Sequence, residues 1–221
     1  MSYSKSFFDS WSSEMAYVLG FFYADGYLQK NSRGSSYVCF VSTDKELIQG
    51  IHAILKSNHK IGEKPPSKFR KKTLYVLQIG STYWFEKLES LGLTQNKSLT
   101  IRLPQIPREY LSHFVRGYFD GDGGVYLEKY FAKDRNEYRW VFSCSFTSGS
   151  RLFLEDLHEA LSFYISGGQL KTKERGFELV FSHRDSLALS HLMYDNAPTE
   201  LLLKRKFEVF QQAFRVLNMR I

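Results

Sequence analysis

The feature that most constrains this chain is a nine-residue stretch that occurs twice. Val18–Gly26 reads VLGFFYADG, and Val115–Gly123 reads VRGYFDGDG. In each copy a glycine lies five residues before an aspartate, and a second glycine follows that aspartate directly. The two copies keep a constant offset of 97 residues, so that Gly20, Asp25 and Gly26 correspond to Gly117, Asp122 and Gly123. A repeat of this kind predicts one structural unit used twice.

Each copy is typical of the last turns of a helix that is buried on most sides, because its residues are largely apolar. Small residues recur at a spacing of four, which places them on one face of the helix. Two such faces can approach backbone to backbone. The sequence therefore predicts a close helix pair with this set at the interface: Gly20, Ala24, Gly117 and Gly121. The glycines after the aspartates, Gly26 and Gly123, are expected to end the helices in the left-handed conformation.

The repeated aspartates are expected to lie close together in the folded chain. Asp25 and Asp122 would stand at the last turns of the paired helices, where a negative charge opposes the helix dipole and also its twin. A cation between them would relieve both repulsions. The carboxylate oxygens favour a hard divalent ion such as Mg²⁺.

At these residues the chain resembles the LAGLIDADG homing endonucleases, in the single-chain form that carries two motifs. Segments that match each other follow both motifs, so the resemblance covers essentially the whole chain. It implies an α+β fold of two pseudo-symmetric αββαββα halves, with antiparallel four-stranded sheets that form a DNA-binding saddle and motif helices packed at the centre. It also implies a monomeric, site-specific endonuclease that hydrolyses both DNA strands across the minor groove of a long target and leaves short 3′ overhangs.

The composition agrees with a nucleic-acid partner. The 221 residues carry a net charge of +7 and a pI of about 9.3, which favours a polyanion. Cys39 and Cys144 stand at similar places in the two repeats and are expected to be buried thiols in a reducing compartment. With no membrane-length apolar run or signal peptide, we expect an intracellular protein in a DNA-containing compartment, such as a bacterial or archaeal cytoplasm or an organelle, and no membrane partner.

The predicted organisation is an N-terminal repeat over residues 1–96, a linker over 97–107 and a C-terminal repeat over 108–221. In the first repeat, hydrophobic periodicity predicts strands near 27–33 and 37–42, a helix from 43, a hairpin over 67–81 and a helix over 84–91. In the second it predicts the same order, ending in a helix over 200–217.

The resemblance also implies roles for individual residues. Asp25 and Asp122 would hold Mg²⁺, with Ala24 and Gly121 contributing small size and a nearby carbonyl. Mn²⁺ would substitute, and Ca²⁺ would be non-productive. A basic residue in each half would approach the scissile phosphates: Lys97 in the first and Lys206 in the second, where Lys204 competes. Asp120 is rated as secondary, because the first motif has Tyr23 at its place.

Relatives also carry a polar residue in the second strand of each half to order water. The aligned positions are Val41, or its neighbour Ser42, and Ser145. Val41 cannot do that job, which leaves open how equally the two DNA strands are cut.

Alternate strand residues should form the DNA-reading face, with Arg, Gln and Asn on bases and Lys mostly on phosphates. The candidates in the first half are Tyr27, Gln29, Asn31, Arg33, Tyr37, Lys68, Arg70 and Lys72. Those in the second half are Tyr126, Glu128, Tyr130, Arg139, Lys171, Lys173 and Arg175.

Two alternatives stay open. A maturase that binds intron RNA could use the same fold and basic face, and a DNA-binding regulator could keep the fold without the chemistry. The retained pair of aspartates favours cleavage over both. The dispersed histidines and two cysteines offer no zinc spacing, and Asp120–Gly124 fails as an EF-hand because the fifth and twelfth loop positions carry no oxygen ligand.

Overall fold

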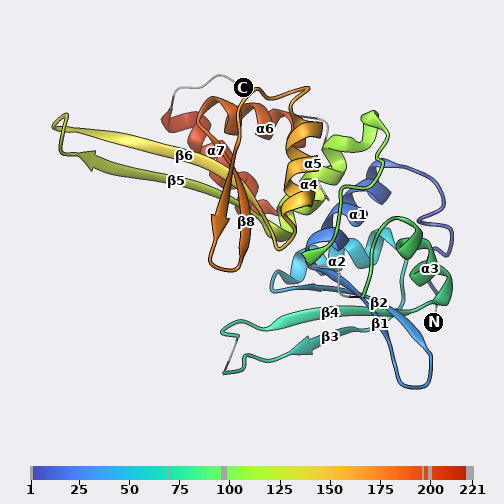
Figure 1. Ribbon diagram of the computed structural model, residues 1–221. Coiled ribbons are helices and arrows are strands. Elements are labelled where there is room, and N and C mark those ends of the chain that lie inside the picture. Colours follow the sequence, from blue (N-terminus) through green and yellow to red (C-terminus); the bar gives the residue numbers. More distant parts are fainter. Residues whose placement is uncertain (1, 69, 96–98, 196, 199–200, 218–221) are drawn as a thin grey trace.

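The chain folds into two halves that repeat one architecture (Figure 1). The structure is a computed structural model and describes residues 2–68, 70–95, 99–195, 197–198 and 201–217. The first half contains α1 (Ser13–Asp25), β1 (Gly26–Lys30), β2 (Ser36–Ser42), α2 (Lys45–Ile54), β3 (Ile61–Lys64), β4 (Leu74–Gly80) and α3 (Thr82–Ser90). The second contains a 3₁₀ turn η2 (Arg108–Tyr110), α4 (Leu111–Asp122), β5 (Gly123–Ala132), β6 (Glu137–Ser148), α5 (Arg151–Leu161), β7 (Gln169–Lys173), β8 (Gly176–Ser182), α6 (Arg184–Tyr194) and α7 (Lys204–Val216).

Each half contributes one four-stranded antiparallel sheet. The strand orders are β1-β2-β4-β3 and β5-β6-β8-β7, so the two sheets have the same topology. One face of each sheet is covered by helices and buries apolar side chains, such as Phe40 in β2 and Phe142 and Phe146 in β6. The α+β fold class with repeated αββαββα halves is confirmed.

The motif helices α1 and α4 pack against each other at the junction of the halves. A Cβ atom added to Gly20 would lie 2.1 Å from the carbonyl oxygen of Phe114, and one added to Gly117 would lie 2.0 Å from that of Tyr17. These two contacts are related by the offset of the repeat, so the interface is nearly two-fold symmetric. The helix backbones touch at positions where any side chain would force them apart.

The glycines that follow the two motif helices contradict the predicted left-handed ending. Gly26 has φ −93° and ψ 160°, and Gly123 has φ −87° and ψ 161°, which is extended backbone. They start β1 and β5 directly. Space requires glycine here, because a Cβ atom would lie 2.3 Å from the ring of Phe22 or of Phe119.

The predicted hairpin over 67–81 is also placed wrongly. Its first arm is β3, which ends at Lys64, and the basic residues that follow Pro65–Pro66 form a loop instead of a strand. A proline cannot donate to the strand ladder, and the residue before it is restricted as well. Only one isolated bridge, between Ser67 and Arg70, is found within the described part of that loop.

Two segments, one after α3 and the other at the start of α7, form ion pairs with the opposite half of the molecule. Arg102 donates two hydrogen bonds to Asp156 of α5, at 2.6 and 2.7 Å. At the start of α7, Arg205 donates to both carboxylate oxygens of Asp44, which precedes α2, at 3.0 and 2.8 Å. The two halves are thus tied together outside the helix interface as well.

The hairpins that follow the motif helices differ in length. β5 and β6 have 10 and 12 residues, whereas β1 and β2 have 5 and 7. The β5–β6 hairpin therefore extends well beyond the rest of its sheet (Figure 1).

Within the described residues, none of the helices has the length and apolar character that would be needed to span a membrane.

Candidate active site and nucleic-acid interface

The two repeated aspartates meet at the ends of the paired helices. Asp25 is the last residue of α1, and Asp122 is the last residue of α4. The Oδ2 atom of Asp25 lies 3.4 Å from the position that a Cβ atom would take on Gly121, the neighbour of Asp122. Burial raises the pKa of Tyr118, and both carboxylates raise it further, so their fields overlap at this one side chain.

The donor chemistry of this pair fits a hard divalent cation. The two carboxylates stand where helix dipoles also concentrate negative charge. In the described part of the chain, no group of three or more His, Cys, Asp or Glu residues could hold a metal ion. Mg²⁺ is commonly bound through one or two carboxylates, with water and substrate phosphates completing its shell. Asp25 and Asp122 fit that pattern.

Lys206 reaches the same site from α7. Its side chain is buried, and its Nζ atom donates to the carbonyl oxygens of Phe119 at 2.5 Å, Asp120 at 3.0 Å and Gly123 at 2.6 Å, with Gly121 at 3.4 Å. Asp120 and Gly121 lie in the last turn of α4, so the ammonium satisfies carbonyl groups that the helix leaves unpaired. The Phe119 carbonyl also accepts from the backbone amide of Gly123. Burial lowers the pKa of Lys206 to about 8, whereas Asp120, Asp25 and Asp122 act in the opposite direction.

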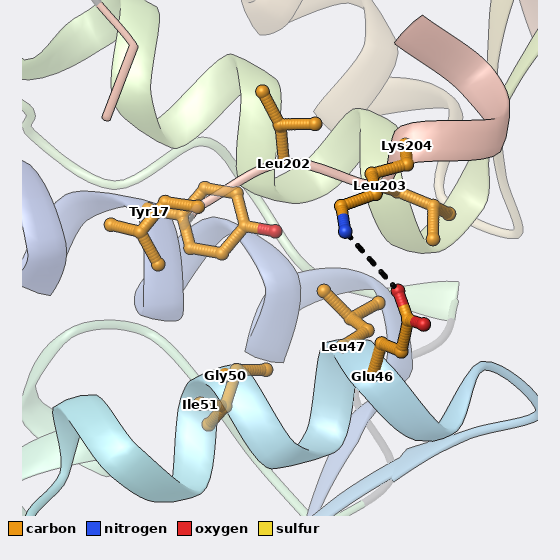
Figure 2. A pocket seen from close by; sticks show the side chains of 9 residues that line it. Tyr17, Glu46, Leu47, Gly50, Ile51, Leu202, Leu203 and Lys204 are labelled. Atoms are coloured by element: carbon orange, nitrogen blue, oxygen red, sulfur yellow. Dashed lines mark ion pairs between the residues drawn. The ribbon is translucent and has the colours of Figure 1, made fainter. Parts of the chain in front are cut away.

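The other basic candidates have different positions. Lys204 is exposed, and its Nζ atom lies 4.0 Å from a carboxylate oxygen of Glu46. Figure 2 shows Lys204 directed towards Glu46 of α2. Lys97 lies outside the described residues.

A buried polar cluster on α4 was not anticipated from the sequence. Arg116 is 1% exposed and donates to the carbonyl oxygens of Leu201 at 2.9 Å and Met193 at 2.8 Å. Asp120 is 2% exposed and accepts from the Tyr17 hydroxyl at 2.8 Å. Burial raises the pKa of Asp120 to about 6, while the Tyr17 hydrogen bond lowers it. The available signal was Arg116 and Asp120, two charged residues among the largely apolar residues that precede Asp122 in the motif helix.

The strand register corrects the alignment of the water-ordering positions. Gly26 pairs with Phe40, and Gly123 pairs with Phe146, so these two phenylalanines are equivalent. The counterpart of Val41 is therefore Thr147, and the counterpart of Ser145 is Cys39. The Thr147 hydroxyl donates to the carbonyl oxygen of Asp122 at 2.9 Å.

The same register shows that the two cysteines do not occupy equivalent places. Cys39 pairs with Tyr27 on the sheet face that turns away from the helices, whereas Cys144 faces the helices. Both are buried free thiols.

A cavity of about 410 Å³ adjoins Asp122. Thr147 lines it together with Lys173 and Arg175, which come from the β7–β8 hairpin. Two carboxylates, Asp122 and Glu174, border this open space together with two hydroxyl groups and two basic side chains. The two basic side chains are suitable partners for a phosphate group.

In the second half, the predicted DNA-reading residues share one sheet face. Tyr126, Glu128 and Tyr130 alternate along β5, and Tyr130 pairs with Arg139 of β6. Through the pairing of β6, β8 and β7, Lys171 and Lys173 lie on this face as well, and Arg175 lies in the β7–β8 turn. Alternation along β6 and β7 adds three polar residues that the sequence reasoning missed: Ser143, Ser145 and Gln169.

In the first half, the candidates divide between the sheet and its loops. Tyr27, Gln29 and Tyr37 share the face that turns away from the helices, and the register adds Gln78 to them. The others lie in loops: Asn31, Arg33, Lys68, Arg70 and Lys72.

Two of these loop residues already bond to the backbone of their own loop. The Asn31 side chain accepts from the backbone amides of Arg33 at 3.0 Å and Ser35 at 2.8 Å. Arg70 donates to the carbonyl oxygens of Lys72 and Pro65 at 2.9 and 2.8 Å, and of Lys64 at 3.2 Å. Both side chains therefore shape the loops that would carry the other contacts.

The fold and site together define a class of protein: a two-motif α+β chain with two acidic helix ends at a pseudo-two-fold axis between two open sheets. Residues 12–91 match the family model described as LAGLIDADG-like domain. The homing endonuclease I-WcaI bound to its DNA recognition sequence superposes with a TM-score of 0.62 at 15% identity, covering 92% of this chain and 91% of that chain. I-SmaMI bound to uncleaved DNA in the presence of calcium ions gives a TM-score of 0.62 at 12% identity over 95% and 92% of the two chains. Residues 12–91 thus match a LAGLIDADG-like domain, and over nearly its whole length the chain has the fold of these two homing endonucleases.

Two curated proteins match parts of the sequence. The replication factor C small subunit of Methanocaldococcus jannaschii is 27% identical over 117 residues, which are 52% of this chain and 6% of that protein. The probable translation initiation factor IF-2 of Thermococcus kodakarensis is 43% identical over 67 residues, which are 28% of this chain and 5% of that protein. The chain thus spans only a small fraction of the length of these relatives.

Proposed function

We propose that this protein is a site-specific endonuclease that hydrolyses both strands of a long DNA target. The observation that carries the proposal is the meeting of Asp25 and Asp122 at the ends of two helices packed glycine to backbone. A protein that only bound nucleic acid would gain no stability from two carboxylates placed at the negative ends of adjacent helix dipoles.

Different residues of the chain would bind the metal, stabilise the site and contact the DNA. Asp25 and Asp122 would hold Mg²⁺, which supplies activation of water and stabilisation of the leaving oxygen in phosphodiester hydrolysis. Lys206 keeps a positive charge beside Asp122 while it fixes the end of α4. The two sheets would lie in the major groove on either side of the axis, since a β-ribbon fits that groove. Cleavage would then occur across the minor groove and leave short 3′ overhangs.

The remaining assignments follow from this function. Ala24 and Gly121 would keep the helix ends close enough for their carboxylates to share the site. Residues 1–96 and 108–221 would each read one half of the target as parts of one monomer, with residues 97–107 as the connector. DNA as a substrate would place the protein in a DNA-containing compartment.

A randomised library of duplex DNA tests the proposal directly. The purified protein is incubated with the library in Mg²⁺ and, separately, in Ca²⁺, and new ends are sequenced. We expect double-strand ends at one related set of sequences in Mg²⁺ only. Asp25→Asn and Asp122→Asn should each reduce the cleavage rate by more than about 100-fold, on the scale of one lost electrostatic contact to the transition state. They should keep binding in Ca²⁺ within about threefold.

Two outcomes would contradict the proposal. Cleavage that survives in the double variant would remove the aspartates from the mechanism. Binding without cleavage in Mg²⁺ would leave a nucleic-acid-binding protein, and intron RNA would then be the next substrate to test. The matched control is Asp195→Asn, because Asp195 is the C-cap residue of α6, outside the motif helices.

A further inference from the structure

A row of three apolar residues crosses the first-half sheet on the face that turns away from the helices. Val41 of β2 pairs with Val76 of β4, which in turn pairs with Gly62 of β3. Their strand neighbours Phe40 and Leu77 are buried on the opposite face, which the helices cover (Figure 1). Residues directly opposite one another on antiparallel strands share a face. The three residues therefore lie side by side on the open face.

The row begins beside the end of α1. Gly26, which follows Asp25 directly, pairs with Phe40, the neighbour of Val41 in β2. On the DNA that we propose as substrate, Val41 would therefore meet base pairs of the first half-site that are close to the centre of the target.

The equivalent row of the second half is polar and charged. In place of the three apolar residues it carries Thr147, Glu178 and Lys171, which pair across β6, β8 and β7 in the same register. Glu178 also accepts a hydrogen bond from the Nζ atom of Lys173 at 3.2 Å. This place in the fold thus accommodates polar side chains, and the apolar row is a property of the first half.

Val41 is the accessible member of the apolar row. It is half-buried, whereas Val76 beside it is only 8% exposed. Gly62 adds no side chain next to Val76. Among the described residues, and apart from the chain neighbours of Gly62, a Cβ atom there would meet only the Val76 carbonyl oxygen within 4 Å, at 3.7 Å.

The chemistry of this row suits one feature of a base edge. A valine side chain neither donates nor accepts a hydrogen bond, so Val41 cannot read the polar groups of a base. Thymine presents an apolar group in the major groove, its C5-methyl, and apolar side chains contact that methyl group. Burial of one methyl group against an apolar side chain changes affinity by about fourfold.

We propose that Val41 is a specificity-determining residue that reads a thymine methyl group in the first half of the target. This inference rests on the proposed function, because it takes duplex DNA as the ligand. It concerns binding, so it can be tested without cleavage.

The experiment removes the methyl group and changes no base pairing. A duplex selected from the randomised library by binding in Ca²⁺ is synthesised with each thymine in turn replaced by uracil, and affinities are measured in Ca²⁺. We expect uracil to weaken binding about fourfold at one or more thymines near the centre of the target. A methyl contact releases no counterions, so the thymine-to-uracil ratio should not change with salt concentration.

Variants assign this methyl effect to Val41. Val41→Thr keeps the shape of the side chain but replaces one methyl group with a hydroxyl, and should lower the thymine-to-uracil ratio from about four to below about two. Val41→Ala shortens the side chain and should have the same effect, which keeps the test decisive if Val41→Thr does not fold. Val180→Thr is the matched control. Val180 is also half-buried and lies on the open face of the second-half sheet, so the response of the same thymine should persist in this variant.

The inference is overturned if no thymine responds to uracil, if the response persists in both Val41 variants, or if Val180→Thr removes it as well. A selected target without thymine near its centre in either strand would overturn it too. Failure of the proposed function looks different. A protein that binds selectively but does not cut contradicts the endonuclease and leaves the Val41 test in force, whereas a protein that selects no duplex contradicts both.

Discussion

The two motif helices share a pattern but differ in what surrounds them. Leu19 of α1 is equivalent to Arg116 of α4, and Tyr23 is equivalent to Asp120. All four side chains are buried. α1 is therefore packed mainly by apolar contacts, whereas α4 carries a buried guanidinium and a buried carboxylate. The repeat fixes the helix interface in both halves and leaves the outer faces of the helices free to differ.

The buried charges of α4 are explained by the backbone groups that pack against this helix. The carbonyl oxygens of Met193, in the last turn of α6, and of Leu201, shortly before α7, accept from Arg116 of α4. Buried carbonyl groups need partners, and a long cationic side chain supplies several donors at once. The comparison teaches that a repeated motif specifies where two helices meet, while the attached segments decide which polar groups become buried.

The largest expected effect comes from removing this cation. Arg116→Met leaves two buried carbonyl oxygens without their donor and should lower the free energy of unfolding by about 3 kcal/mol or more. Leu19→Met at the equivalent position conserves volume and should cost less than about 1.5 kcal/mol. Urea-induced unfolding of both variants checks the difference. Equal losses would show that the polar cluster stabilises α4 no more than apolar packing stabilises α1.

A smaller effect should come from the feature that the helices share. Gly117→Ala places a Cβ atom 2.0 Å from the Tyr17 carbonyl oxygen. Overpacking should cost about 3 kcal/mol, offset by about 1 kcal/mol of helix propensity. The net loss of about 2 kcal/mol should be matched by Gly20→Ala, because the interface is nearly symmetric.

Gly62→Ala is the control for these variants, since its Cβ atom would lie 3.7 Å from the Val76 carbonyl oxygen, which is an ordinary contact. Thermal unfolding of the three variants measures the effect. If Gly117→Ala and Gly20→Ala differed strongly, the two-fold equivalence of the interface would fail.

The smallest effect should come from an ion pair that joins the halves. Hydrogen bonds from Arg205 lower the pKa of Asp44. A lowered carboxyl pKa stabilises the fold above the unfolded value of about 4, and this contribution is lost as the pH falls through the folded value. Because the pair is partly exposed, Asp44→Asn should cost only about 0.5 kcal/mol at pH 7.

The difference between Asp44→Asn and wild type should shrink as the pH is lowered from 7 to 3, measured by urea unfolding at each pH. Glu46→Gln is the comparison, since the Lys204–Glu46 pair is 4.0 Å long with side chains 72% and 80% exposed. It should have no measurable effect. A pH-independent loss in Asp44→Asn would rule out the charge as its cause.

The motif helices and the strands could be predicted because they depend on spacing within one element. The offset of 97 residues predicted that the two aspartates lie together, and the family resemblance implied the antiparallel sheets. The prediction failed where strands beyond the motif helices had to be aligned. A constant offset of 97 residues aligns α1 with α4, but the longer β5–β6 hairpin changes the offset for the following strands. Val41 was therefore matched to Ser145 instead of Thr147.

The hydrogen-bond partners of Asp120 and Tyr23 were not predicted for a related physical reason. Their partners, Leu203 and Leu91, come from segments far away in the chain, so only the folded structure reveals them. Hydrogen-bond partners of a buried polar residue are a tertiary property.

The unequal hairpins give the molecule a direction. β5 has five residues more than β1, which at about 3.3 Å per residue adds about 16 Å of reach on one side of the axis. Along a duplex that rises about 3.4 Å per base pair, this corresponds to about five further base pairs. On the DNA that we propose as its substrate, the protein would therefore contact two half-sites of different length. Reversing the orientation of the target would place each half-site on the wrong hairpin. A palindrome built from either half-site alone would match only one of the two hairpins.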